Sequence, residues 1–242
     1  MSRLFRLALA TVIGTLALLA LGGVARLHPA GSGCGNDWPL CNGSLLPALE
    51  WASLVEYLHR GVALTVLALS AATALTAYRI WEASPRLRLL AGVGFLSIVL
   101  QSVIGGFAAR YGAPANIAIL HLTLAMLFFG CAVAILAIVA AGRGAPAWLA
   151  SLGRWPSQDR DPVFARIALA GAALTLLLLL FGATTSSTGS LACATWPLCA
   201  ESAGDGRMET VIHLGYRATA LLGTLATRIT AFAAWKRGAT LL

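Results

Sequence analysis

The sequence reads IAILHLTLAMLFFGCAVAILAIVAA over residues 117–141, a stretch without a charged side chain. A helix needs roughly 20 apolar residues to cross the hydrocarbon layer of a bilayer. Further stretches of about this length occupy residues 5–25, 54–78, 89–109, 167–184 and 210–232. Since 59% of the residues are hydrophobic and only 11% are charged, the composition excludes an ordinary soluble domain. We predict an all-α, polytopic membrane bundle of six spans.

Basic residues sort to one side of these spans. One face holds Arg3, Arg6, Arg79, Arg86, Arg88, Arg143, Arg154, Arg160, Arg166, Arg228, Lys236 and Arg237, and the opposite loops hold only Arg26, Arg110 and Arg207. Loops rich in Lys and Arg face the cytoplasm, so both termini are predicted to be cytoplasmic. The first stretch is longer than the apolar region of a signal peptide, roughly 7 to 15 residues, and is interpreted as a retained span. The net charge of +8 therefore indicates contact with a lipid bilayer and not with nucleic acid.

The chain contains an internal repeat. Residues 31–41, GSGCGNDWPLC, recur as GSLACATWPLC at residues 189–199, with the first two and the last four letters in identical register. Each copy follows an odd-numbered span and precedes a span with a polar cluster near its outer end. If one repeat has four spans, the second copy stops after two. We predict a four-helix unit at residues 1–145 and a partial second repeat at residues 146–242.

The most informative polar cluster is EYLHR at the start of the second span. Glu56, His59 and Arg60 are spaced i, i+3 and i+4, so they share one helical face. Ionisable groups inside hydrocarbon are costly and are candidates for function. The equivalent cluster of the second repeat holds His213, Tyr216 and Arg217, with the two arginines at equivalent positions.

Two histidines are predicted at matched depth. With a rise near 1.5 Å per residue, His59 lies about 9 Å below Ser53, and His121 of the fourth span lies about 7.5 Å below Asn116. Two facing histidines in a bundle core are a common way to hold heme iron. A zinc site, with Glu56 as a further ligand, remains an alternative. So do interfacial histidines that only form hydrogen bonds.

Glu56 and Arg60 each allow two interpretations. Arg60 is suited to bind a heme propionate, because a guanidinium pairs well with a carboxylate, or its charge reaches the lipid headgroups. Glu56 lies near the start of its helix, where the helix dipole favours a carboxylate. It is also placed to act as an acid, a base or an electrostatic stabiliser beside a substrate.

Four of the five cysteines lie in the two long outer loops: Cys34, Cys41, Cys193 and Cys199. Thiols that lie close together outside the cytoplasm tend to oxidise. Neither spacing is the C-x-x-C of a thioredoxin-like redox motif. Structural disulfides are therefore favoured over redox-active ones.

At these residues the sequence resembles the heme A synthase family, membrane enzymes that convert heme O to heme A for cytochrome oxidases. The resemblance rests on LGGVARLHPAGSGCGNDWPLCNG (21–43), EYLHR (56–60), QSVIGGF (101–107), the pair His121-Leu122, and FGATTSSTGSLACATWPLCA (181–200). It covers nearly the whole chain. The paired WPLC loops together with E-x-x-H-R make it specific.

The resemblance implies a substrate site in the first four spans. His59 and His121 would flank heme O, and Glu56 would take part in oxidising a ring methyl to a formyl group. The resemblance also implies that Cys34 pairs with Cys41 and Cys193 with Cys199. Family members usually have eight spans, and a second histidine pair in their C-terminal half holds a heme b cofactor.

This sequence departs from the family pattern in the second repeat. The family reads H-x-x-H-R where this chain has His213, Tyr216 and Arg217, so a tyrosine stands at the expected ligand position. Tyrosine ligates heme iron in other folds, but one axial position would then stay open. Arg217, like Arg60, is a candidate for heme binding. The electron-transfer heme b is in question, and so is whether the site at His59 and His121 holds heme O or heme b.

The leading hypothesis is a shortened, six-span heme A synthase in the plasma membrane of a bacterium or archaeon, with the Cys loops outside the cytoplasm. It would oxidise the C8 methyl of heme O to a formyl group through hydroxylated intermediates and pass electrons to an acceptor. The second hypothesis is a non-catalytic heme-binding protein: a heme carrier, a partner in oxidase assembly or an electron-transfer cytochrome. A third hypothesis is that the chain is an incomplete gene product or that two copies combine to complete the missing half. Expected partners are heme O, a heme O synthase and, under the third hypothesis, a second copy of the chain.

Overall fold

The computed structural model describes residues 3–25, 33–79, 85–112, 114–142, 162–188 and 207–239. These ranges contain six helices: α1 (Arg3–Ala25), α2 (Trp51–Arg79), α3 (Pro85–Tyr111), α4 (Ala115–Gly142), α6 (Pro162–Thr188) and α7 (Arg207–Ala239). The predicted all-α class is confirmed. The chain divides into two compact units, Met1–Trp155 and Pro156–Leu242. The boundary predicted after residue 145 stays a prediction, since residues 143–161 lie outside the described ranges.

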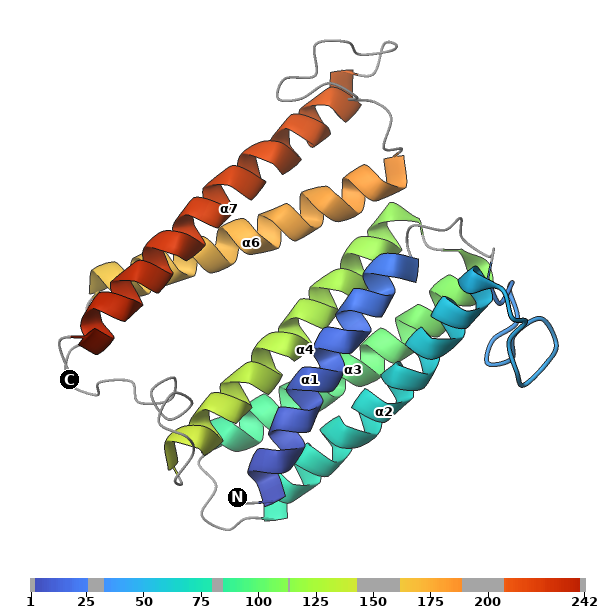
Figure 1. Ribbon diagram of the computed structural model, residues 1–242, viewed down its shortest axis with the longest axis horizontal. Helices are drawn as coiled ribbons and strands as arrows, with labels where there is room; N and C mark the ends of the chain where they lie inside the picture. Colours follow the sequence, from blue (N-terminus) through green and yellow to red (C-terminus); the bar gives the residue numbers. More distant parts are fainter. Residues whose placement is uncertain are drawn as a thin grey trace. The chain divides into compact units, whose positions relative to one another are not determined.

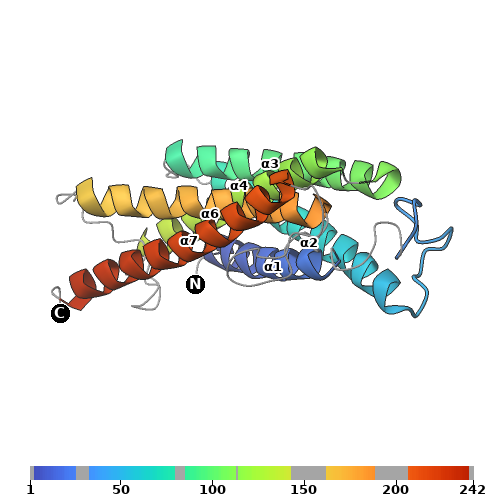
Figure 2. The same cartoon turned by 90° about the horizontal axis from the view of Figure 1, so that it is seen from above.

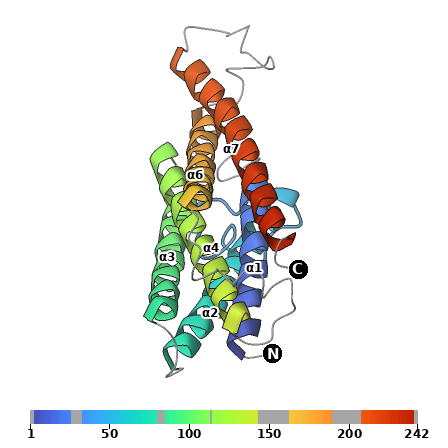
Figure 3. The same cartoon turned by 90° about the vertical axis from the view of Figure 1, so that its left-hand side faces the viewer.

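The first unit is a bundle of four antiparallel helices (Figures 1 and 3). In it α1 packs against α2 and α4, and α3 packs against the same two helices. Because α2 and α4 share both neighbours, they lie across the bundle from each other. Each of these two helices carries one of the predicted histidine ligands.

Within the ranges that the structure describes, four helices are long and apolar enough to cross a membrane: α1, α2, α3 and the part Asn116–Ala140 of α4. They make the chain an integral membrane protein. In the second unit α6 contains the apolar stretch Ala173–Gly182, and α7 carries charged or polar His213, Arg217 and Arg228 within its length. Both predicted C-terminal segments are helical. Their crossing of a membrane stays a prediction.

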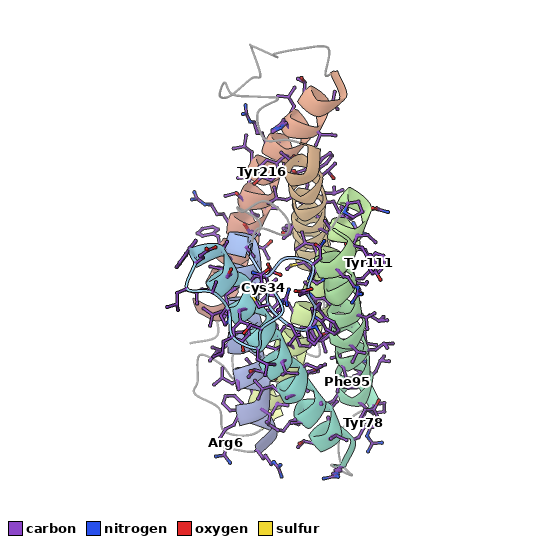
Figure 4. The ribbon with its side chains drawn as sticks, turned by 90° about the vertical axis from the view of Figure 1, so that its right-hand side faces the viewer. Arg6, Cys34, Tyr78, Phe95, Tyr111 and Tyr216 are labelled. Carbon is purple, nitrogen blue, oxygen red and sulfur yellow. A yellow bond between two sulfur atoms is a disulfide. The ribbon has the colours of Figure 1, made fainter. Side chains whose placement is uncertain are left out.

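The two ends of the first unit differ in chemistry. Arg6 and Tyr78 lie towards one end, and Cys34 and Tyr111 lie towards the other (Figure 4). We call the end with Arg6 and Tyr78 the basic end, because the helix ends there carry Arg3, Arg6, Arg79, Arg86 and Arg88. We call the end with Cys34 and Tyr111 the loop end. It carries residues 33–50, which lie next to the last turn of α3 (Figure 2). The sidedness of the termini relative to a membrane stays a prediction.

Small and hydroxyl-bearing side chains bring the helices of the first unit close together. A methyl group added to Gly14 would lie 3.0 Å from Val66, and one added to Gly94 would lie 3.2 Å from the Cβ of the buried Cys131. The hydroxyls of Thr11 and Thr73 meet across α1 and α2 at 3.3 Å. Such close approach drives helix association in lipid, where burial of apolar surface contributes little. This close packing sets the separation of the helices whose outer ends carry the candidate site.

Candidate functional site

The loop of residues 33–50 is closed by the disulfide between Cys34 and Cys41. This confirms the first of the two predicted pairings. Both cysteines are buried, and the backbone folds back on itself through reciprocal hydrogen bonds between Cys41 and Ser44. Asn42 and Gly43 adopt left-handed backbone conformations in this turn, with φ of 51° and 77°. An asparagine and a glycine tolerate this conformation better than other residues do.

The start of this loop is bound to α2 through the carbonyl of Gly33. The hydroxyl of Ser53 and the side-chain amide of Asn42 both donate to that oxygen, at 2.9 and 3.0 Å. A methyl group added to Gly33 would lie 2.6 Å from Oε2 of Glu56 and 2.8 Å from the carbonyl oxygen of Ala52. Any larger residue at this position would therefore push the loop away from Glu56.

Glu56 uses both of its carboxylate oxygens inside the protein. Oε2 accepts a hydrogen bond from the backbone N–H of Cys34 at 3.0 Å, and Oε1 forms an ion pair with Arg60 at 2.5 Å. The carboxylate is partly exposed, with 26% of the side-chain surface accessible. Glu56 therefore links α2 to the disulfide loop while part of it remains open to a further partner.

Arg60 binds a different part of the same loop, residues 37–40. Its Nη1 donates to the carbonyl oxygens of Leu40 at 2.8 Å, Asp37 at 3.1 Å and Pro39 at 3.5 Å. Its Nη2 donates to Glu56. The guanidinium is thus committed to the loop backbone, a role that neither sequence interpretation included. Binding of a heme propionate by Arg60 stays a prediction.

The indole of Trp38, from the WPLC motif, covers the loop end of α3. A methyl group added to Gly106 would lie 3.2 to 3.4 Å from three atoms of that indole. The glycine therefore leaves room for an aromatic ring against the helix backbone. Trp38 connects the loop between α1 and α2 to α3, so the loop spans two helices of the bundle.

His59 lies against the backbone of α1. A methyl group on Gly22 would lie 3.1 Å from Cε1 and 3.6 Å from Nδ1 of the imidazole. Nδ1 is buried and has no hydrogen-bond partner among the described residues. The Nδ1 edge of the ring thus faces α1. Because Nδ1 lies against α1, Nε2 is the ring nitrogen that remains for a ligand.

His121 repeats this arrangement on the other helix pair. A methyl group on Gly105 of α3 would lie 3.1 Å from Cε1 and 3.8 Å from Nδ1 of His121. We call Gly22 and Gly105 the glycine seats. Each seat lies on the helix before its histidine, so α1–α2 and α3–α4 present their imidazoles in matching orientation. The matched histidines predicted from sequence are therefore also matched in their packing.

The bundle below the two histidines is apolar. A cluster of Leu18, Val66, Ile98 and Phe128, one from each helix, is almost fully buried. On α3, Gln101 lies about 6 Å deeper than Gly105 at the helical rise per residue. Its side chain is 7% exposed, and its Oε1 has no hydrogen-bond partner among the described residues. An unpaired buried amide oxygen is unusual enough to indicate a missing partner, such as a ligand or water.

These residues fit a heme better than a bare metal ion. Within the described ranges there is no group of three or more His, Cys, Asp or Glu side chains that could hold a metal ion, which a structural zinc site requires. Two imidazoles on diagonal helices, an apolar floor and a polar loop end match the needs of an amphipathic tetrapyrrole. His59 and His121 are the residues that would hold its iron.

The second unit presents a related arrangement on α6 and α7. A methyl group on Gly182 of α6 would lie 3.2 Å from Cε2 of Tyr216, as Gly22 does for His59. His213, at the repeat position of Glu56, is 7% exposed, and its Nε2 has no hydrogen-bond partner in the described part. Arg217 follows on the same helix and is half-buried. The predicted pair Cys193 and Cys199 lies outside the described residues.

The sequence interpretation missed several residues of this site. Gly22, Gly33 and Trp38 were not singled out, although double glycines at 22–23 and 105–106 occur near the outer ends of the first and third spans. That recurrence was a usable signal for the glycine seats. The position of Trp38 over Gly106 had no signal in the sequence, because the two residues are far apart along the chain.

Fold and site together define a class: an integral membrane protein whose four-helix unit presents two matched histidines beneath a disulfide-closed loop. The family model described as cytochrome oxidase assembly protein matches residues 5–237 of this chain. The chain belongs to that family.

Individual relatives agree with this assignment. The heme A synthase of Bacillus licheniformis is 29% identical over an alignment of 225 residues, which covers 89% of this chain and 70% of that protein. That of Symbiobacterium thermophilum is 34% identical over an alignment of 193 residues, with coverages of 78% and 61%. That of Exiguobacterium sibiricum is 28% identical over an alignment of 187 residues, with coverages of 76% and 60%. The chain thus spans between 60% and 70% of the length of these relatives.

Proposed function

We propose that the protein is a heme A synthase that oxidises the C8 methyl of heme O to a formyl group through hydroxylated intermediates. The observation that carries the proposal is the pair of glycine seats, which hold His59 and His121 in the same orientation on diagonal helices. Membership of the family and the similarity to proteins named heme A synthase support it. The substrate would be heme O, supplied by a heme O synthase.

The residues of the chain have distinct roles in this proposal. His59 and His121 bind the iron of the substrate and fix the position of its ring. Glu56, partly exposed at the loop end, holds or moves a proton near the methyl that is oxidised. The disulfide loop, bound through Arg60 and Trp38, covers the site and limits the entry of water. The conversion of the methyl to a formyl group takes one oxygen atom from water and releases four protons and four electrons, and the electrons pass to an acceptor outside these residues.

The proposed location is the plasma membrane of a bacterium or archaeon, with the disulfide loop outside the cytoplasm. The basic end carries the arginines that favour the cytoplasmic side, and a disulfide persists where the surroundings are oxidising. We further propose that a second copy of the chain is a partner, and that Cys193 and Cys199 pair as Cys34 and Cys41 do. The proposal includes a heme b at His213 and Tyr216, where the residues match the family pattern in part.

A second candidate function is heme binding without catalysis. One observation favours it: both oxygens of Glu56 already bind groups of the protein. A carboxylate that only holds the loop in place would suit a heme carrier, an oxidase-assembly partner or an electron-transfer cytochrome.

The test is to express the chain together with a heme O synthase in cells that lack any other heme A synthase. The hemes bound to the purified protein are then extracted and separated by chromatography. Heme A or its hydroxylated precursor in this sample, and not in cells with the heme O synthase alone, supports the enzyme. Heme O or heme b bound without any oxidised product favours the second candidate.

The glycine seats supply a further prediction. Gly22→Val is expected to displace His59 and to weaken heme binding by between about fivefold and 150-fold, since overpacking costs about 1–3 kcal/mol. Gly23→Val is the matched control, because a Cβ at Gly23 meets nothing within 4 Å in the described part. Heme titration followed by absorption measures both. Equal affinities of the two variants would contradict a role for the seat.

A further inference from the structure

An open groove of about 390 Å³ lies at the loop end, between the disulfide loop and the last turn of α3. Trp38 and Leu40 of the loop and Arg110 and Tyr111 of α3 line it. Asp37 is the acidic residue of the lining, and its backbone carbonyl binds Arg60. The groove therefore has aromatic and aliphatic walls. Arg110 of α3 lines it, and Arg60 of α2 binds the backbone carbonyls of two lining residues, Asp37 and Leu40.

The groove lies beyond the histidine site along α3, and Trp38 lies next to both. Gly105 is the seat of His121, and the next residue, Gly106, contacts the indole of Trp38. Arg110 lies one turn further along α3 from Gly106, about 7.5 Å along the helix axis from Gly105. A ligand that begins at His121 and extends towards the loop end therefore passes Trp38 and reaches Arg110.

The charge distribution at the loop end points to Arg110 as the available cation. Arg60 is balanced by Glu56, and its nitrogens donate to three loop carbonyls. Arg110 is exposed, and within the described ranges it forms no ion pair. Its guanidinium lies 5.9 Å from the centre of the Tyr111 ring. A guanidinium beside apolar walls is well suited to bind a carboxylate.

We propose that Arg110 binds a propionate carboxylate of the tetrapyrrole whose iron lies between His59 and His121, with the Trp38 indole as the wall of that subsite. This rests on the proposed function for the identity of the ligand. The apolar floor of Leu18, Val66, Ile98 and Phe128 takes the opposite, apolar edge of the ring. The ligand is thus oriented with its carboxylates towards the loop end.

The test compares two probes on the full chain in detergent: iron protoporphyrin IX, whose propionates are free, and its dimethyl ester, whose propionates are neutral. Arg110→Gln is expected to weaken binding of the free acid about tenfold, equivalent to about 1.4 kcal/mol, and to leave binding of the ester unchanged. Arg86→Gln, at the basic end of the same helix, is the control and should change neither affinity. Absorption titration measures all of these.

Three outcomes overturn the inference. Unchanged affinity of Arg110→Gln for the free acid removes Arg110 from the site. Equal weakening for both probes shows that Arg110 acts through the loop and not on a carboxylate. An equal loss in Arg86→Gln shows a general effect of charge. None of these readouts depends on conversion of heme O, so failure of the inference is distinguishable from failure of the proposed enzyme, which only the expression experiment tests.

Discussion

Replacing Glu56 by Gln is expected to stop oxidation of heme O while heme stays bound. The substitution keeps the size of the side chain, and its amide oxygen can still accept from the N–H of Cys34. It removes the charge and the ability to take up a proton. Because general acid–base catalysis contributes about 10²–10⁴-fold, we expect product formation to fall by about that factor. Chromatography of extracted hemes measures the product, and absorption measures the bound heme.

The matched control for Glu56 is Arg60→Gln, which breaks the same ion pair from the other side. Arg60 also holds three carbonyls of the loop, so this variant perturbs the loop at least as much as Glu56→Gln does. If Glu56 acts on the substrate, Glu56→Gln loses more product than Arg60→Gln. If Glu56 only binds the loop, the two variants lose similar amounts, and the non-catalytic candidate gains support.

Replacing His59 by Gly is expected to abolish stable heme binding at this site. Loss of an outer-shell partner of a metal ligand already costs roughly 10–100-fold in affinity, and loss of the ligand itself should cost more. The variant also leaves a space beside Gly22 that matches a free imidazole in shape. Added imidazole should therefore restore heme binding and the absorption spectrum of the native protein.

Leu58→Ala is the control for His59, because Leu58 is the preceding residue and is 53% exposed. It should bind heme as the native chain does, with or without imidazole. Heme binding by His59→Gly that equals that of Leu58→Ala would contradict the assignment of His59. A variant that binds no heme even with imidazole, yet keeps its oligomeric state in detergent, would show that His59 supports the site in a way other than as an iron ligand.

The helices were predictable because a bilayer sets their minimum length. The stretches predicted at residues 5–25 and 54–78 became α1 and α2 with ends shifted by at most three residues. The spacing of Glu56, His59 and Arg60 on one face followed from helical periodicity alone. The disulfide between Cys34 and Cys41 was predicted from the family resemblance, and the structure confirms it.

The partners of the polar side chains were not predictable in the same way. Arg60 binds carbonyls of residues that lie about twenty positions earlier in the chain, and no local rule identifies such acceptors. Trp38 meets Gly106 only because the loop folds over α3. These contacts depend on how the loop closes around the disulfide, which is a property of the tertiary structure.

The glycine seats have a mechanical consequence. A ring that meets the main chain of the next helix has no flexible side chain beside it to absorb a displacement. A change in the separation of α1 and α2, or of α3 and α4, therefore alters the contact of an imidazole with the neighbouring helix. A ligand bound by both rings would therefore connect the two helical hairpins, α1–α2 and α3–α4, near the loop end.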